Sequence, residues 1–277
     1  MRMPTPDFAQ AAPAEPLRPY ISHYVGFRAR GLQPSVHSAL PSRHLGLAIS
    51  LADPIQILRT PRSSHPVSHR ALIGGFSIGP STVAYGTRRD GLFVHLKPNG
   101  VFALFGIRAL ELSSQIVDLS LIWGSTSCPV IDRLAAASKW PERFAILDRT
   151  FLEMVKPIQT PIELSWAWNR LAETRGCITI DDLATGVGWS RQHLGKRFFH
   201  EFGTSPKTAA RIFRFETALR LLRARRMGLA AVAAECGFHD QAHMTLEWHA
   251  MAGCSPKQWI IRELPFFQYP DFLELDD

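Results

Sequence analysis

The chain has 277 residues, which corresponds to about two domains, and 46% of its residues are hydrophobic against 20% charged, a balance typical of packed cores rather than disorder. No window approaches the roughly 18 consecutive apolar residues of a membrane span, and the polar, proline-rich N-terminus lacks the apolar region of a secretory signal. We therefore expect a cytoplasmic protein with no membrane partner, and its net charge of +7 suggests a polyanionic partner.

The first half of the chain is predicted to be rich in β-strands. Short apolar or alternating runs at residues 20–29, 44–51, 55–60, 71–79, 82–86 and 91–97 are separated by Pro, Gly, Ser and Asn. This spacing is typical of an antiparallel sandwich or barrel. Short helical turns are expected at 99–106 and 109–114, and helices at 129–138 and 142–155. The apolar stripe of the last helix (Phe144, Leu147, Phe151, Leu152 and Val155) suits a dimer interface or the domain's own core.

The second half is predicted to be almost wholly helical. The two prolines of residues 156–161 mark a linker, so the expected domains are 1–155 and 162–277. One pattern occurs twice, at 178–206 and 227–256: helix, Gly-aromatic turn, helix, Gly, Ser-Pro. Each copy indicates a helix-turn-helix, with Ser190 and Asp240 as N-caps of the second helices. The expected core positions are Leu183, Ala184, Val187, Leu194 and Phe198 in the first copy and Val232, Ala233, Cys236, Met244 and Trp248 in the second.

This doubled pattern, joined by a long helix at 210–224, resembles the DNA-binding domain of AraC/XylS-type transcription regulators over residues 162–262. The shared motifs are DLA…G.S…L…F…FG.SP, R…R.E.AL.LL, VA.ECGF.D..H and G.SP..W. The stretch from residue 74 to 124 is similar to the β-rich sensor half of some of these regulators. The resemblance implies a two-domain α+β protein, with a cupin-like N-terminal barrel or sandwich and an all-α double helix-turn-helix.

Positive charge is concentrated in the first copy and the helix that follows it. Residues 189–226 hold ten Lys and Arg against two acids, and residues 227–277 hold two against eight. Burial of Leu194 and Phe198 would turn the opposite face of their helix toward DNA. Resemblance places base contacts at Gln192, Gly195 and Lys196, although a glycine offers no side-chain contact. The predicted contacts of this copy are Ser190, Arg191, Gln192, Gly195, Lys196 and Arg197, with Arg191 and Arg197 on phosphate.

The second copy is predicted to bind DNA more weakly. No Lys or Arg lies between Asp240 and Ala250, and Glu247 adds a negative charge. Phosphate neutralisation dominates non-specific affinity, so this copy should add mostly apolar contact, including thymine methyl groups. Its predicted contacts are Gln241, Ala242, Thr245 and Leu246. Arg211 and Arg214, on the connecting helix, are candidate DNA contacts or framework residues that pair with Glu216 or with carbonyl groups.

Enzyme and metal-binding motifs do not occur in the sequence. HExxH, P-loop and GxGxxG motifs are missing, and the run GGFSIG at residues 74–79 lies in a strand-rich region with no helix after it, so it does not form a GxSxG nucleophile elbow. The cysteines at 128, 177, 236 and 254 are too widely spaced for a zinc site or a disulfide framework. In the first half only His65 and His69, of the six histidines at 23, 37, 44, 65, 69 and 95, are close in sequence. We therefore expect no enzyme, no metal and no cofactor.

The sequence thus predicts a bacterial, sequence-specific regulator whose partner is a double-stranded DNA operator. The first half is expected to bind a small-molecule effector; alternatives are a ligand-free homodimerisation module and, from another class, a cupin-like metalloenzyme fused to a DNA-binding tail. The acidic-aromatic tail at 263–277 has RNA polymerase or the basic helices as candidate partners.

Overall fold

The computed structural model describes residues 7–124, 127–224 and 227–262. The chain divides into two compact units. The first comprises Met1–Ala39, His44–Gly75 and Ser81–Ile158, and the second comprises Leu40–Arg43, Phe76–Pro80 and Gln159–Asp277. Two short segments of the N-terminal half thus group with the C-terminal helices. The tail at 263–277, for which we named candidate partners, lies outside the described residues.

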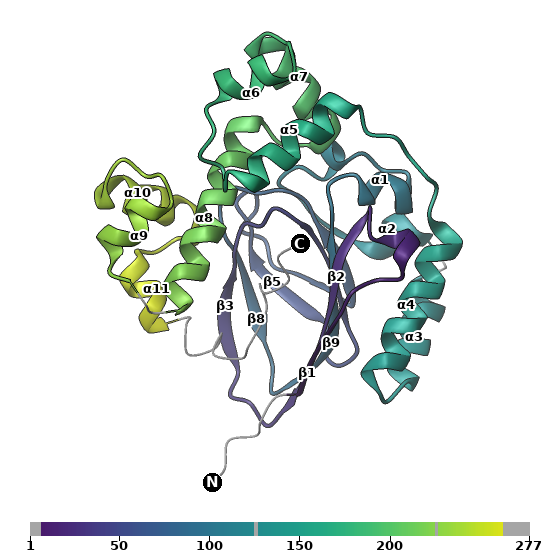
Figure 1. Cartoon of the computed structure of the whole chain (residues 1–277). Coiled ribbons are helices and arrows are strands. Elements are labelled where there is room, and N and C mark those ends of the chain that lie inside the picture. Colours follow the sequence, from purple (N-terminus) through teal and green to yellow (C-terminus); the bar gives the residue numbers. More distant parts are fainter. Residues whose placement is uncertain (1–6, 125–126, 225–226, 263–277) are drawn as a thin grey trace. The chain divides into compact units, whose positions relative to one another are not determined.

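The first unit is built on two antiparallel sheets (Figure 1, purple to blue). The six-stranded sheet has the order β1 (Asp7–Ala11), β2 (Ile21–Arg30), β9 (Arg88–Leu96), β4 (Leu45–Ser50), β7 (Ala71–Gly74) and β10 (Ile116–Asp118). The four-stranded sheet has the order β3 (Ser35–Ala39), β8 (Ser81–Tyr85), β5 (Ile55–Arg59) and β6 (Val67–His69). Ile57 and Val83 from the smaller sheet pack with Leu72 from the larger one, so side chains of both sheets share a core.

Strand sequence explains the burial in these sheets. In β4 alternate residues Leu45, Leu47 and Ile49 are fully buried, as the two-residue period of a strand requires. The two sheets form a sandwich rather than one closed barrel. The expected fold class, a two-domain α+β protein with a β-rich first half, is confirmed.

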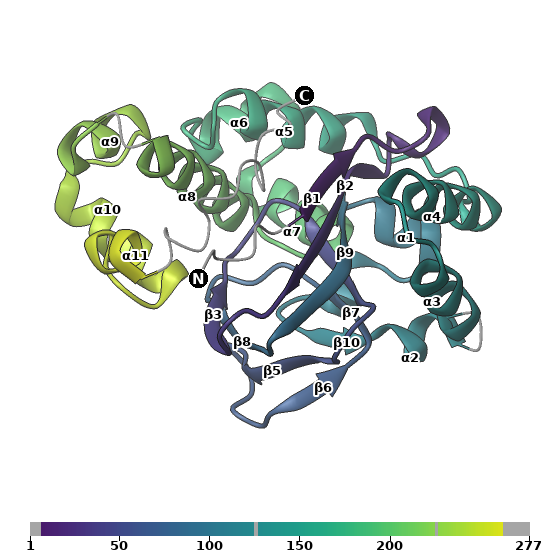
Figure 2. The ribbon, with the colours of Figure 1, turned by 90° about the horizontal axis from the view of Figure 1, so that it is seen from below.

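Helices cover one side of the six-stranded sheet. The first unit contains η1 (Glu15–Leu17), α1 (Gly100–Phe105), η2 (Ala109–Leu112), α2 (Leu119–Trp123), α3 (Ser127–Ala136) and α4 (Trp140–Met154). Figure 2 shows α3 and α4 side by side along β2 and β9. The Trp140 ring lies against Gly26 of β2, where a Cβ atom would come within 2.4 Å of it. Phe144, Leu147 and Phe151 are buried, so most of the apolar stripe of α4 fills the unit's own core. Leu152 is 41% exposed and Val155 is half-buried.

The second unit is all helical among its described C-terminal residues. Its helices are α5 (Ile162–Glu173), α6 (Ile180–Gly186), α7 (Arg191–Phe202), α8 (Pro206–Ala224), α9 (Leu229–Glu235), α10 (Gln241–Ala252) and α11 (Pro256–Arg262). The long helix α8 leads from the α6–α7 pair to the α9–α10 pair (Figure 1, green to yellow). Residues 155–161, which include the expected linker, contain neither helix nor strand.

The predicted core of this unit is confirmed. Nine of the ten expected positions are buried, and only Val187 is half-buried against the core. Trp168 packs against Phe198, Phe202 and Phe213 in the first half of the unit. Burial raises the pKa of the Cys236 thiol to about 11, with smaller contributions from Cys177 and Glu235, which fits its expected role as a small apolar residue.

Four short strands differ from the expected pattern. β1 and β10 lie outside the predicted β region, β6 lies in a segment expected to be a loop, and β3 has no predicted counterpart. The predicted strand at 71–79 ends at Gly74. Across the described ranges, no helix is both long enough and apolar enough to cross a bilayer.

Candidate nucleic-acid interface

The first helix-turn-helix is defined by two capped helices and a glycine turn. The Thr179 hydroxyl accepts a hydrogen bond from the amide of Asp182 at 3.1 Å and begins α6. Gly188, at φ +72°, makes the left-handed turn that favours glycine. The Ser190 hydroxyl then accepts from the His193 amide at 3.2 Å and begins α7. The Ser190 cap is as predicted.

The reading face of α7 is directed away from the core. Leu194 and Phe198, one turn apart, are fully buried. Arg191, Gln192, Lys196 and Arg197 are therefore exposed on the remaining surface of the helix. A Cβ atom built on Gly195 meets nothing within 4 Å, so this position opens a gap in the face. The structure thus brings the predicted contacts of the first copy onto one exposed helix.

The second helix-turn-helix repeats this construction with different side chains. The Asp240 carboxylate accepts from the His243 amide at 2.7 Å and caps α10. The hydrogen bond from the His243 amide, together with a hydrogen bond from the His239 side chain, holds the pKa of Asp240 below its usual value. Met244 and Trp248 are buried. Each copy ends in a left-handed glycine followed by a serine that caps the next helix: Gly203 and Ser205 in the first, Gly253 and Ser255 in the second.

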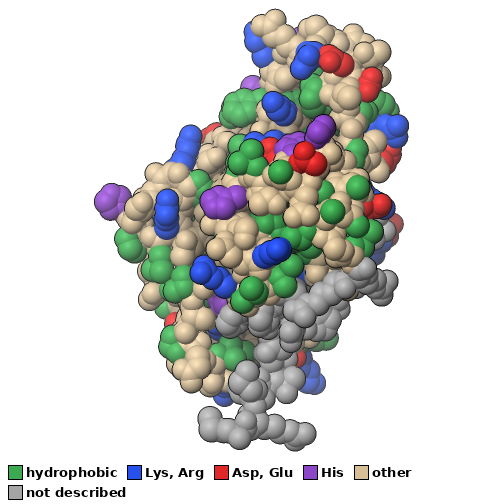
Figure 3. Space-filling view, turned by 90° about the vertical axis from the view of Figure 1, so that its left-hand side faces the viewer, with side chains coloured by type: hydrophobic (Ala, Val, Ile, Leu, Met, Phe, Trp, Pro, Cys, Tyr) green, Lys and Arg blue, Asp and Glu red, His purple; other side chains and the backbone are tan. Residues whose placement is uncertain are grey.

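The exposed face of α10 is almost uncharged. Gln241 and Ala242 are exposed, and the Leu246 side chain is 72% exposed. Thr245 is half-buried and donates its hydroxyl hydrogen to the Gln241 carbonyl at 2.8 Å. Figure 3 faces the side on which α9–α11 lie in Figure 1, and there hydrophobic and histidine side chains are exposed between basic ones.

The two arginines predicted as candidate contacts on α8 bind groups within their own unit. Arg211 donates from Nε to Oε2 of Glu247 at 2.6 Å, and both side chains are about one-fifth exposed. Arg214 donates to the Gly176 carbonyl at 2.7 Å and lies over the Phe238 ring. This geometry matches the framework role that the sequence left open. The pairing with Glu216 that was considered for these arginines is not the one observed.

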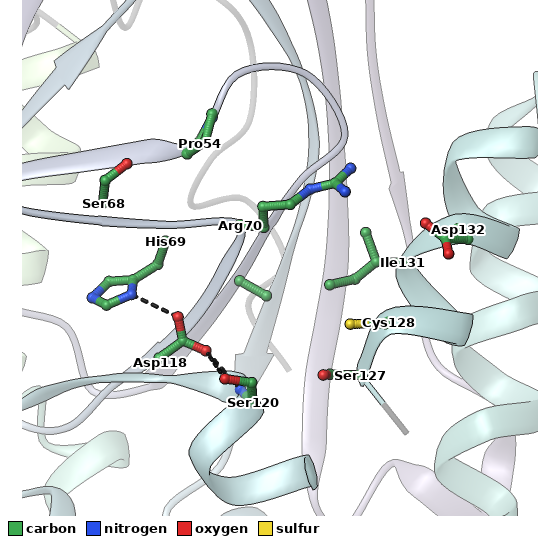
Figure 4. Close-up of a pocket in the computed structure, with 11 residues that line it drawn as sticks. Pro54, Ser68, His69, Arg70, Asp118, Ser120, Ser127, Cys128, Ile131 and Asp132 are labelled. Carbon is green, nitrogen blue, oxygen red and sulfur yellow. Dashed lines mark hydrogen bonds and ion pairs between the residues drawn. The ribbon is translucent and has the colours of Figure 1, made fainter. Parts of the chain in front are cut away.

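A shallow pocket lies in the first unit (Figure 4). Its volume is about 260 Å³, and it lies between β6, β7, β10 and the helices α2 and α3. Arg70 extends from the strand side toward α3, and Cys128 and Ile131 point from α3 into the same space (Figure 4). The lining residues are Pro54, Ser68, His69, Arg70, Ala71, Asp118, Ser120, Ser127, Cys128, Ile131 and Asp132.

A hydrogen-bonded pair, His69 and Asp118, organises one wall of this pocket. His69 Nδ1 lies 2.6 Å from Asp118 Oδ2, and the other Asp118 oxygen accepts from the Ser120 amide and hydroxyl. Burial alone would raise the pKa of Asp118, but the hydrogen bonds from Ser120 and His69 outweigh it, so the pKa lies below its usual value. No sequence signal joined these residues, because they are 49 positions apart and belong to different strands.

Three histidines gather inside the six-stranded sheet region. The rings of His23 and His95 stack with their centroids 4.0 Å apart, and His44 lies edge-on, 6.0 and 5.7 Å from them. Burial, followed by repulsion from His23 and His44, lowers the pKa of His95 well below its usual value. Within the ranges that the structure describes, no group of three or more His, Cys, Asp or Glu residues is arranged to hold a metal ion.

Comparison with known proteins identifies the class of the second unit. A family model described as a helix-turn-helix domain matches residues 183–262, and one for a domain of unknown function (DUF6597) matches residues 9–118. The HTH-type transcriptional regulator Rv1931c of Mycobacterium tuberculosis is 28% identical over 134 residues. That match covers 48% of this chain and 49% of the relative, so the chain spans about half the length of this curated protein.

The whole fold has a counterpart among solved structures. ToxT from Vibrio cholerae superposes with a TM-score of 0.51 over 94% of this chain and 98% of that chain, at 8% identity. The similarity is therefore one of fold, and it covers both units. The chain therefore carries an AraC-type helix-turn-helix domain in its second unit, joined to a β-rich first unit. The expected family resemblance is confirmed.

Proposed function

We propose that this protein is a sequence-specific DNA-binding transcription regulator that acts in the cytoplasm and is not an enzyme. The observation that carries the proposal is the pair of capped helix-turn-helix motifs in one unit, each with its second helix exposed on the face opposite the core. Such a helix fits the major groove of DNA and brings its outer side chains to the base edges.

The first copy supplies most of the affinity in this proposal. Lys196 reaches a guanine and Gln192 an adenine, because the Lys ammonium donates to guanine O6 and N7 and the Gln amide pairs with adenine at two points. Arg191 and Arg197 contact phosphates on either side of the groove. The Ser190 amide and hydroxyl lie at the helix N-terminus, where a phosphate is favoured.

Arg211 and Arg214 act on DNA binding indirectly. Each is committed to a partner within the unit, Glu247 and the Gly176 carbonyl. In this proposal Arg211 positions α10, and Arg214 positions the segment before α6, for contact with the major groove of DNA.

Retention of genomic fragments tests this function. The purified full chain is mixed with fragments and excess competitor DNA at two salt concentrations. Selective retention that weakens as salt rises is the expected result, because bound phosphates release counterions. Lys196→Ala should lose the selected fragment, whereas Lys139→Ala, an exposed lysine of the first unit, should retain it. Absence of selective retention by the unaltered protein would contradict the proposal.

The first unit serves as the regulatory half, and its pocket is the proposed effector site. Arg70 and the His69–Asp118 pair offer polar and charged groups, and Ala71 and Ile131 offer apolar ones. The volume of about 260 Å³ lies below the range of pockets for drug-sized ligands, so the proposed effector is a small polar metabolite. A thermal-shift screen of small carboxylic acids and amines on the full chain tests this. A stabilising compound should lose its effect in Arg70→Gln; equal stabilisation of both forms would place its site elsewhere.

Dimerisation through the first unit and binding of RNA polymerase are tested with the same purified protein. A ligand-free dimerisation module would give a homodimer in light scattering and no stabilising compound in the screen. RNA polymerase binding is tested by co-purification of polymerase with the operator-bound regulator. Phe144, Leu147 and Phe151 in α4 are buried in the unit's own core, so Leu152, which is 41% exposed, is the residue of that stripe left for a dimer contact.

A further inference from the structure

We propose that α10 reads the 5-methyl groups of thymine, so that the second half of the operator is recognised by apolar contact and not by charge. This inference rests on the proposed DNA-binding function and specifies the half-site that α10 meets. It rests on three features of the exposed helix face.

The first feature is the chemistry of the exposed side chains. Leu246 is 72% exposed although it is one of the most apolar residues, and Ala242 lies one turn before it. In the part of α10 between Gln241 and Ala250 there is no Lys or Arg. An apolar group gains from contact in the major groove only where DNA presents a methyl group, and thymine is the unmodified base that does so.

The second feature is the orientation of Thr245. Its hydroxyl hydrogen is committed to the Gln241 carbonyl at 2.8 Å, one turn back along the helix. A threonine whose hydroxyl bonds to its own helix presents its methyl group as the remaining contact. Thr245 therefore extends the apolar strip formed by Ala242 and Leu246, and Gln241 remains the polar reader at the helix start.

The third feature is the neutralisation of the nearest acid. Glu247 follows Leu246 directly, and an unpaired carboxylate there would repel phosphate. It accepts instead from Arg211 at 2.6 Å, and His243 Nε2 lies 3.9 Å from its other oxygen. Asp240 is occupied as the cap of α10. The Glu247 charge is therefore compensated within the unit, and the Asp240 charge is held at the N-terminus of α10.

The helices α7 and α10 then contribute differently to DNA binding. α7 places Lys196 and Arg197 on DNA and gives an affinity that depends on salt, whereas α10 adds discrimination that hardly changes with salt. Removal of one buried methyl group costs about 0.8 kcal/mol, which is about a fourfold loss of affinity. Each thymine methyl read by α10 should therefore contribute about threefold to fivefold.

Uracil interference tests the proposal directly. The operator recovered from genomic fragments is prepared with thymine randomly replaced by deoxyuridine, which lacks only the 5-methyl group. The full-length protein is allowed to bind this DNA, and bound DNA is separated from free DNA. The deoxyuridine positions in each fraction are then mapped. We expect interference at two or three thymines about one helical turn from the sites protected by α7. A single replacement there should weaken binding about threefold to fivefold.

Matched variants connect the methyl groups to α10. Thr245→Val keeps a methyl and removes the hydroxyl, so binding and interference should persist, whereas Thr245→Ser should lose interference at one thymine. Leu246→Ala should lose it at another, and its high exposure predicts unchanged thermal stability. Specific binding without any effect of deoxyuridine in this half-site would overturn the inference and leave the regulator function intact. A complete lack of selective binding would instead contradict that function.

Discussion

The Nε atom of Arg211 on α8 lies 2.6 Å from Oε2 of Glu247 on α10, and this pair fixes the second reading helix to the helix that joins the two motifs. Both side chains are only about one-fifth exposed, so water screens their interaction less than at the surface. The sequence predicts that the charge of Glu247 weakens DNA binding. In the structure this charge is compensated by Arg211 within the same unit.

Arg211→Ala should destabilise the second unit by about 1–2 kcal/mol, because Glu247 is left partly buried without its cation. Urea unfolding of the full chain, followed by the fluorescence of the buried Trp248 and Trp259, measures the loss. Glu247→Ala should cost a similar amount, and the double variant should cost clearly less than the sum of the two. Additive losses would indicate that the pair is not coupled.

Gly195→Ala should stabilise α7 by about 0.5–1 kcal/mol, because alanine favours the helix and its Cβ meets no atom within 4 Å. Operator binding by the same variant shows whether the backbone at Gly195 lies close to the DNA. Weaker operator binding by a more stable protein would mean that the helix backbone lies close to the groove, whereas unchanged binding would mean that the base pair there is unread. A drop in stability would contradict the expected open space.

Much of the second unit follows from local sequence. Ser190, Asp240 and the left-handed glycines mark helix boundaries at fixed spacing, and buried positions repeat with the helical period, so both motifs were predicted with their caps. Their exposed faces follow directly from that periodicity. The contact of each face with DNA stays a prediction.

Long-range pairing accounts for what the sequence could not predict. β1 comes from a polar, proline-rich segment, and its backbone forms a strand because β2 offers a partner across 13 or more residues. Arg143 lies within the apolar side of α4, where periodicity alone would place a hydrophobic residue. The pairings of Arg211 with Glu247 and of His69 with Asp118 join residues 36 and 49 positions apart. No local pattern carries such information.

Asp90→Asn should destabilise the first unit by about 3 kcal/mol. The Arg143 side chain is only 3% exposed and donates to Asp90 at 2.6 Å, so removal of the carboxylate charge leaves a buried guanidinium uncompensated. Arg28→Ala is the matched control: Arg28 also binds Asp90, at 3.1 Å, but is 26% exposed and should cost much less. Thermal melting of the three proteins ranks them, and equal losses would contradict this account.

The first unit should lose stability in mild acid because of His95. Its pKa is lowered in the folded state, so below about pH 6.5 the unfolded chain binds a proton that the folded chain does not. Stability is therefore complete above that pH and falls as the pH drops toward the folded-state value. Hydrogen exchange of β9 amides at pH 7.5 and 5.5, corrected for intrinsic rates, should reveal the loss in the unaltered protein and a smaller one in His95→Gln. A stability that is independent of pH over this range would contradict the prediction.

The central claim, that α7 anchors the protein on DNA while α10 adds weaker selective contact, is tested most directly by the affinity of three proteins for one operator. Equilibrium binding is measured for the unaltered chain, Lys196→Ala and Gln241→Ala at two salt concentrations. We predict a loss of at least about tenfold for Lys196→Ala and a smaller loss for Gln241→Ala, and the salt dependence of Gln241→Ala should equal that of the unaltered chain. Equal losses, or a larger loss for Gln241→Ala, would contradict it.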